Sequence, residues 1–226
     1  MIESIVIQRP EGAASQLFLL FHGVCAQPSD MVPLAERLAQ AFPQAVVVCV
    51  AAPEATGAYG GRQWFSIEGV TDDDRPRRVA EAMPAFVQTV RRWQADTGVA
   101  PEATALVGFS QGAIMALESS QLDGLLAGRV VALAGRFARL PERAPAHLTW
   151  HFIHGKADPV IHYGYAVSAA ERLIGLGGDV TADVIPFLGH GVNDEVVSLL
   201  IERLTTHLPQ RVWQAAMSSA EPGPAT

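Results

Sequence analysis

Short apolar segments alternate with amphipathic segments along the whole chain. Seven segments rich in aliphatic and β-branched residues are bounded by Gly, Pro or Asp. Most are continuously apolar, which is typical of strands covered on both faces. They predict strands at Ser4–Gln8, Gln16–Phe21, Ala45–Val50, Thr104–Phe109, Val130–Ala134, Leu148–His154 and Val180–Phe187. Because a Pro-Glu-Gly turn separates the first two, we expect them to form an antiparallel hairpin at one edge.

The segments between these strands carry apolar residues at spacings of three and four, the helical period. They predict helices at Asp30–Phe42, Arg78–Trp93, Gln111–Ser120, Tyr165–Ile174 and Asp194–Leu208. Alternating strands and helices predict a mostly parallel, doubly wound α/β sheet of about seven strands flanked by helices. We expect one domain over residues 1–213, without a separate lid domain, and a flexible C-terminal tail over 214–226, where small and polar residues predominate.

One connection, Ala51–Pro76, is much longer than the others. It is rich in glycine, contains the aromatic pair Trp64 and Phe65, and ends near the acidic run Asp72–Asp74. Long loops in compact domains are commonly functional. We therefore expect this loop to shape a pocket.

Composition narrows the class of protein. The 226 residues are 49% hydrophobic and 17% charged, which excludes disorder for most of the chain. The formal net charge of −7 provides no basic excess for nucleic-acid binding, and no polybasic patch points to a membrane surface. No apolar run approaches the roughly 20 residues of a membrane-spanning helix. With only two cysteines and no export signal, we expect a cytoplasmic protein.

The sequence Gly108-Phe109-Ser110-Gln111-Gly112 lies where a predicted strand gives way to a predicted helix. A serine on such a sharp turn projects its hydroxyl out of the sheet. The flanking glycines are needed because a Cβ at either position would collide with the neighbouring strand or helix. Ser110 is therefore the candidate nucleophile.

A serine hydroxyl needs a base, and on this topology the base follows the acid in the chain. His190 fits, because it follows the last predicted strand in the loop Leu188-Gly189-His190-Gly191. The competing histidines are better explained by structural or exposed roles, although two of them lie near the candidate acid. These competitors are His147, His151, His207 and, near the acid, His154 and His162.

The acid is expected in the loop that follows the preceding strand. Asp158 stands there, directly before Pro159, where its carboxylate can orient an imidazole and stabilise its cation. Asp179 and Asp183 are rivals. Both lie at or within the following strand, which favours surface or capping roles.

A hole for the developing oxyanion needs two N–H donors. One is the backbone N–H of Gln111 at the start of its helix. The other should come from the loop after Gln16–Phe21, with Val24 favoured over Cys25. In the same loop, His22 is better explained as a bracing residue than as a base. Cys25 is a poor nucleophile candidate because no helix begins at it.

Neither a metal nor a nucleotide cofactor is indicated. The histidines show no recognised ligand spacing, and the Gly-rich segments match neither a phosphate loop nor a dinucleotide fingerprint. We expect no cofactor.

Taken together, these motifs resemble those of α/β-hydrolases, and more narrowly the bacterial carboxylesterase/phospholipase family that includes acyl-protein thioesterases. The resemblance runs from about Ile5 to Leu208 and is greatest to the small YpfH-type esterases. It implies a Ser110–His190–Asp158 triad that hydrolyses carboxylic esters or thioesters. It rests on Leu20-Phe21-His22-Gly23, Gly61-Arg62-Gln63-Trp64-Phe65, Gly108-Phe109-Ser110-Gln111-Gly112-Ala113, His154-Gly155, Asp158-Pro159-Val160 and Gly189-His190.

We therefore expect a carboxylesterase that cleaves short to medium acyl esters through an acyl-serine intermediate. The expected partner is a small-molecule ester or thioester. A homodimer is one assembly that the sequence allows. Acyl-protein thioesterase and lysophospholipase are the alternatives within the enzyme class, and a ligand-binding sensor of the same fold is the alternative outside it. Candidates for the walls of the acyl slot are Val24, Trp64, Phe65, Val160 and Leu188.

Overall fold

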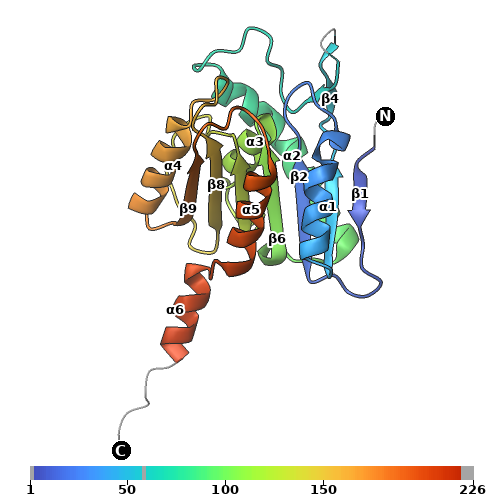
Figure 1. Cartoon of the computed structure of the whole chain (residues 1–226), viewed down its shortest axis with the longest axis vertical. Helices are drawn as coiled ribbons and strands as arrows, with labels where there is room; N and C mark the ends of the chain where they lie inside the picture. The colour runs from blue at the N-terminus through green and yellow to red at the C-terminus, as the bar shows by residue number, and fades with distance from the viewer. Residues whose placement is uncertain (1–2, 58–59, 220–226) are drawn as a thin grey trace, which may run out of the picture.

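The computed structural model describes residues 3–57 and 60–219, and within them a seven-stranded sheet forms the centre (Figure 1). Its strand order is β1-β3-β2-β6-β7-β8-β9, and every neighbouring pair is parallel except β1 with β3. The strands are β1 (Ile5–Gln8), β2 (Gln16–Phe21), β3 (Ala45–Val50), β6 (Thr104–Phe109), β7 (Arg129–Leu133), β8 (Thr149–Gly155) and β9 (Asp179–Ile185). All seven predicted strands are present, each within two residues of its predicted bounds.

The expected hairpin of the first two strands is wrong. β1 is the antiparallel edge strand, but it pairs with β3, and β2 lies between β3 and β6. β2 is almost wholly buried and forms parallel ladders on both sides, so neither of its edges is open to β1. The side-chain amide of Gln8 fixes β1 in place by donating to the carbonyls of Phe42 and Ala45, at 2.9 Å each.

Helices cover both faces of the sheet, as doubly wound folds require (Figure 1). α1 (Val32–Ala41) and α5 (Asp194–Thr206) pack on one face. α2 (Arg75–Thr97), α3 (Gln111–Ser119) and α4 (Gly164–Gly175) pack on the other. Short 3₁₀ turns precede α1 and β6, and the long connection contains a small two-stranded ladder; these are Pro28–Met31, Pro101–Ala103, β4 (Glu54–Ala55) and β5 (Arg62–Gln63). None of the described helices is both long and apolar enough to span a bilayer.

Alternate residues of each central strand enter two separate cores. In β2, Leu17, Leu19 and Phe21 face α2 and α3, whereas Phe18 and Leu20 face α1 and α5. Burial on both faces explains why the central strands are continuously apolar in sequence.

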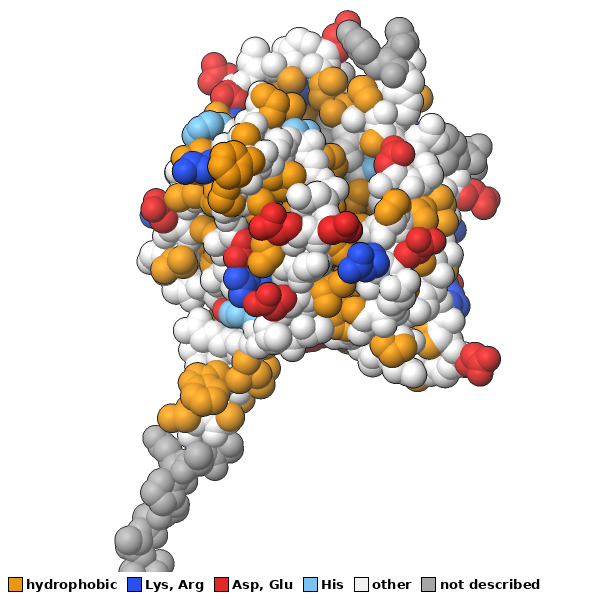
Figure 2. Space-filling view, viewed as in Figure 1, with side chains coloured by type: hydrophobic (Ala, Val, Ile, Leu, Met, Phe, Trp, Pro, Cys, Tyr) orange, Lys and Arg blue, Asp and Glu red, His pale blue; other side chains and the backbone are white. Residues whose placement is uncertain are grey.

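A last helix, α6 (Gln210–Ser219), occupies the described part of the expected tail. Residues 220–226 of that tail lie outside the described part. The carboxylate of Asp179 accepts the backbone N–H of Gln210 at 3.0 Å and so caps the start of the helix. The helix projects away from the body (Figure 1), and apolar side chains are exposed along it (Figure 2). Val212, Trp213 and Met217 are among the exposed ones.

Candidate active site

Ser110 stands on the turn between β6 and α3, in a backbone conformation that few non-glycine residues adopt. Its φ is 52° and its ψ is −115°. Such strain is held by the surrounding structure and clusters at functional sites. The backbone N–H of Ser110 donates to Leu133 of β7 at 3.0 Å, which ties the turn to the neighbouring strand. The side chain therefore has a fixed direction.

The two glycines around this serine permit the close packing of the turn. A Cβ on Gly108 would collide with the backbone of Ala113, and a Cβ on Gly112 would collide with the carbonyl oxygen of Phe21. The prediction that both glycines are sterically required is confirmed. Helix α3 can therefore begin immediately after Ser110 and lie against β2.

The structure brings His190 to this serine. Nε2 of His190 lies 3.0 Å from Oγ of Ser110, although 80 positions separate them. His190 follows β9 in the loop predicted to carry it, and its ring lies 5.0 Å, centroid to centroid, from that of Phe109. The imidazole is thus within hydrogen-bonding distance of the hydroxyl.

Asp158 lies on the other side of the same imidazole. Its Oδ2 is 2.7 Å from Nδ1 of His190, and its Oδ1 accepts the backbone N–H groups of Val160 and Ile161 at 2.8 and 2.9 Å. Burial favours a raised pKa for this carboxyl, but the hydrogen bonds from His190, Ile161 and Val160 outweigh it and hold the pKa below its ordinary value. Asp158 is therefore a carboxylate at neutral pH.

The competing groups lie elsewhere, with one exception. His151 is buried against Thr181, with its pKa lowered to about 3 chiefly by burial, and His207 pairs with Asp179. Asp183 forms an ion pair with Arg203. The exception is His154, which lies 3.2 Å from Asp158. His147 and His162 are exposed, and no group of three or more potential metal ligands occurs among the described residues.

The loop after β2 approaches Ser110 from the side of Gly23. The buried ring of His22 braces this loop, because its Nδ1 contacts the carbonyl of Gly23 and its Nε2 accepts the N–H of Ala52 at 3.2 Å. Burial lowers the pKa of His22, so the ring is neutral. The N–H of Cys25 donates to Arg62 at 2.9 Å and is therefore engaged. For Val24, the described contacts include no acceptor for its N–H.

The side chain of Gln111 connects the start of α3 to the long loop. Its Oε1 accepts the backbone N–H of Trp64 at 2.8 Å, and its Nε2 donates to the carbonyl of Phe65 at 2.7 Å. This clamp was not predicted from the sequence. The only sequence signal was a polar residue at the start of an apolar helix.

Trp64 and Phe65 lie in the hydrophobic core, each 3% exposed. Trp64 packs edge-on against Phe21 and Phe86, and its Nε1–H donates to the carbonyl of His22 at 2.8 Å. The aromatic pair is therefore tied by hydrogen bonds to His22 and Gln111, which flank Ser110 in space. Its predicted contact with a substrate stays a prediction.

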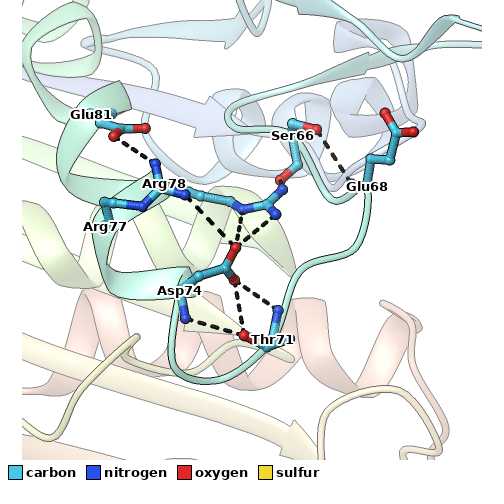
Figure 3. Close-up of polar contacts among 7 residues, drawn as sticks. All are labelled: Ser66, Glu68, Thr71, Asp74, Arg77, Arg78 and Glu81. Atoms are coloured by element: carbon cyan, nitrogen blue, oxygen red, sulfur yellow. Dashed lines mark hydrogen bonds and ion pairs between the residues drawn. The ribbon is translucent and has the colours of Figure 1, made fainter.

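The rest of the long loop is fixed to the start of α2 (Figure 3). The guanidinium of Arg78 bridges the carboxylate of Asp74 and the carbonyl of Ser66, at 2.8 Å each. Asp74 also accepts the N–H of Thr71 at 2.8 Å, and this bond, with that from Arg78, lowers its pKa. The segment from Trp64 to Asp74 is therefore held at both ends, by Gln111 at its start and by Arg78 at its finish.

Apolar side chains are exposed beside the candidate triad. Val160 is 66% exposed and Leu188 is half-buried, as expected for residues near the rim. Phe187 is 97% exposed and adopts a left-handed backbone with φ of 60°. Phe187 was not among the predicted site residues, although its position directly before Leu188 marks it as part of the same loop.

The fold and the Ser–His–Asp arrangement together define an α/β-hydrolase. The phospholipase/carboxylesterase family matches residues 2–208, and the chain belongs to this family. It is 46% identical over 221 residues to Esterase YpfH of Escherichia coli strain K12. The aligned residues cover 98% of this chain and 95% of the relative. It is also 30% identical over 179 residues to acyl-protein thioesterase 1 of Saccharomyces cerevisiae strain S288c, covering 70% of this chain and 77% of the relative.

Solved structures agree with this assignment. Esterase PE8 has a TM-score of 0.80 at 25% identity, covering 91% of this chain and 99% of the other. The carboxylesterase from Mesorhizobium loti has a TM-score of 0.74 at 19% identity, covering 91% and 100%, and shares the fold. The protein is a carboxylic ester hydrolase.

Proposed function

We propose that this esterase acts through Ser110 as nucleophile, His190 as general base and Asp158 as the group that orients the imidazole. The observation that carries the proposal is the continuous chain of contacts from Oγ of Ser110 to Nε2 of His190, at 3.0 Å, and from Nδ1 of His190 to Oδ2 of Asp158, at 2.7 Å. This is the arrangement that nucleophilic acyl transfer requires.

In the proposed reaction, His190 takes the hydroxyl proton as Oγ of Ser110 attacks the ester carbonyl. The tetrahedral intermediate collapses to an acyl-serine as His190 returns the proton to the leaving alcohol. Water, activated by the same imidazole, then attacks the acyl-serine and releases the acid. The carboxylate of Asp158 stabilises the imidazolium in both halves of the reaction.

The N–H groups of Gln111 and Val24 would hold the oxyanion. The N–H of Gln111 belongs to the first turn of α3, where N–H groups lack intrahelical acceptors and the helix dipole favours negative charge. Between the two loop candidates, Val24 is favoured over Cys25 because the N–H of Cys25 already donates to Arg62.

Substrate choice is proposed to favour esters with short to medium acyl chains. Val160 and Leu188 form an apolar rim near Asp158 and His190, and this rim suits a modest hydrocarbon chain better than a charged group. Because thioesters follow the same oxyanion chemistry and a thioesterase is among the relatives, an acyl-protein thioesterase is the second candidate.

The test compares Ser110→Ala with wild type on p-nitrophenyl acetate. Loss of the nucleophile is expected to lower kcat by a factor on the order of 10⁴ or more. Ser29→Ala, at an exposed serine outside the site, is the matched control and should keep full activity. A fluorophosphonate should label wild type and Ser29→Ala but not Ser110→Ala. Intact turnover by Ser110→Ala would refute the assignment.

A panel of oxygen esters and thioesters of graded acyl length separates the candidates. Highest kcat/KM for oxygen esters of short to medium length supports the carboxylesterase proposal. Preference for long-chain acyl thioesters supports the thioesterase. Tight binding of the esters without product release would indicate a ligand sensor.

A further inference from the structure

His154 is a buried histidine in β8 that the proposed reaction does not use. It is 1% exposed. Its Nε2 lies 2.8 Å from the carbonyl oxygen of Ile161 and 3.2 Å from Oδ2 of Asp158. Because a carbonyl and a carboxylate are both acceptors, Nε2 must carry the ring proton and share it between them.

This N–H closes a ring of contacts around the acid. Ile161 donates its backbone N–H to Oδ1 of Asp158 at 2.9 Å, and its carbonyl accepts from His154. His154 therefore holds both the carboxylate and the turn that presents it. Oδ2 in turn lies between two imidazoles, with Nδ1 of His190 at 2.7 Å.

A histidine at position 154 is less favourable for the stability of the fold than an aliphatic side chain of similar size. Nδ1 of His154 is buried and has no hydrogen-bond partner among the described residues. An unpaired buried polar atom destabilises the folded state. Burial also lowers the pKa of the ring, more than the neighbouring Asp158 raises it, so His154 is neutral. An aliphatic side chain would avoid the unpaired nitrogen but would provide no donor to Asp158 or Ile161.

We propose that His154 is a positioning residue: its Nε2–H fixes the carboxylate of Asp158 at the angle and distance that hold His190 toward Ser110. The inference rests on the proposed triad and assigns it a fourth side chain. Without this donor, two backbone N–H groups still hold Oδ1, but Oδ2 keeps only the contact with His190 among the described residues. The angle at which Oδ2 meets the imidazole is then less tightly fixed. The charged and titratable groups that face His154 are Asp158 and His190.

The test uses two variants at position 154 that differ in the donor. His154→Leu removes the N–H, whereas His154→Gln can place an amide N–H where Nε2 stands. On p-nitrophenyl acetate, His154→Leu should lower kcat by about tenfold to a hundredfold with KM changed less than about twofold, because misplaced catalytic groups affect the chemical step. His154→Gln should recover kcat to within about threefold of wild type.

The pH profile provides a readout that a merely structural role would not move. With one donor removed from Oδ2, the carboxylate binds the imidazolium of His190 more strongly. The half-maximal point on the acid side of the kcat/KM profile should therefore move to higher pH in His154→Leu and stay in place in His154→Gln.

His151→Leu is the matched control. His151 is a buried histidine of the same strand, but its Nδ1 contacts Thr181 and not the candidate triad. Once folded, this variant should keep the wild-type kcat and pH profile. If His154→Leu does not fold, His154→Asn replaces it, because the shorter amide cannot reach both acceptors.

The inference is overturned if the donor-free variant keeps kcat within about twofold of wild type, if His154→Gln is no better than that variant, or if His151→Leu loses as much activity. These results leave the triad intact provided that Ser110→Ala is inactive. Activity in Ser110→Ala would instead refute the triad itself, so the two failures are distinguishable.

Discussion

Oδ2 of Asp158 lies 2.7 Å from Nδ1 of His190, while Oδ1 of the same carboxylate accepts two backbone N–H groups. The carboxylate is therefore held by its own loop before it contacts the imidazole. The Asp158 side chain is 0% exposed, so water does not compete for these bonds.

Asp158→Asn should preserve the shape of the site and remove its charge. The amide cannot stabilise an imidazolium and can hold the ring in the wrong tautomer, so kcat on p-nitrophenyl acetate should fall by a factor on the order of 10³–10⁴. Asp183→Asn is the control, because it removes a carboxylate that pairs with Arg203 outside the site. Equal activity in both variants would contradict the proposed role of Asp158.

Gly112→Ala should prevent normal packing of α3 against β2. The new Cβ collides with the carbonyl oxygen of Phe21, which is backbone and cannot move aside cheaply. We expect a loss of several kcal/mol in the free energy of unfolding or no soluble protein. Gly175→Ala is the control, because a Cβ there meets nothing within 4 Å. Its free energy of unfolding in urea titrations should lie within about 1 kcal/mol of the wild-type value. An unchanged urea midpoint for Gly112→Ala would show that the turn has more room than described.

Phe187→Gly should stabilise the protein. Phe187 has a φ of 60°, where glycine is favoured, and its side chain is 97% exposed, so removing it sacrifices little packing. A gain of about 1 kcal/mol is expected from thermal or urea unfolding. Phe187→Ala is the matched control, since it removes the ring but keeps the Cβ and its strain. A comparable gain in both variants would mean that the exposed ring, not the backbone, is the unfavourable feature.

Asp179 should make stability depend on pH in acid. Burial would raise the pKa of its carboxyl, but hydrogen bonds from Gln210, Thr149 and His207 outweigh this and lower the pKa below the ordinary 3.8. The unfolded state therefore binds the proton more readily, and stability contributed by Asp179 is present above pH 3.8 and lost as pH falls through the lower folded value.

Asp179→Asn removes that titration, so its free energy of unfolding should vary less than that of wild type between pH 5 and about pH 2. Urea titrations at a series of pH values measure the slope, with Asp123→Asn at an exposed carboxylate as control. A wild-type slope in Asp179→Asn would show that other carboxyls carry the acid sensitivity.

Much of the fold could be predicted because hydrophobic pattern directly reflects burial. Each central strand is covered on two faces and is therefore continuously apolar, which made all seven recognisable. The partner of β1 could not be read in this way, because the Pro-Glu-Gly turn indicated a local pairing while the buried edges of β2 were already taken by β3 and β6. Helix α6 was missed because the tail was interpreted from its small and polar residues, although Val212 and Ala216, and likewise Trp213 and Met217, stand at the helical spacing of four.

The residues of the candidate site were predictable where topology fixes them. Ser110, Asp158 and His190 each follow the end of a parallel strand, and such ends meet at one edge of the sheet. The contacts that support them were not predictable. The clamp from Gln111 to the backbone of Trp64 and Phe65 depends on which peptide groups a distant loop presents. Nothing in the sequence pattern specifies that choice.

Because Asp179 caps α6, this helix begins at the edge of the sheet opposite the candidate triad, and it is the side through which the protein can be tethered. Asp179 begins β9, whereas His190 follows the end of that strand, so the seven residues of the strand, roughly 23 Å, separate the two. An enzyme immobilised on a bead, or fused to a second protein, through the helix that Asp179 caps would keep its reacting groups turned toward the bulk solution.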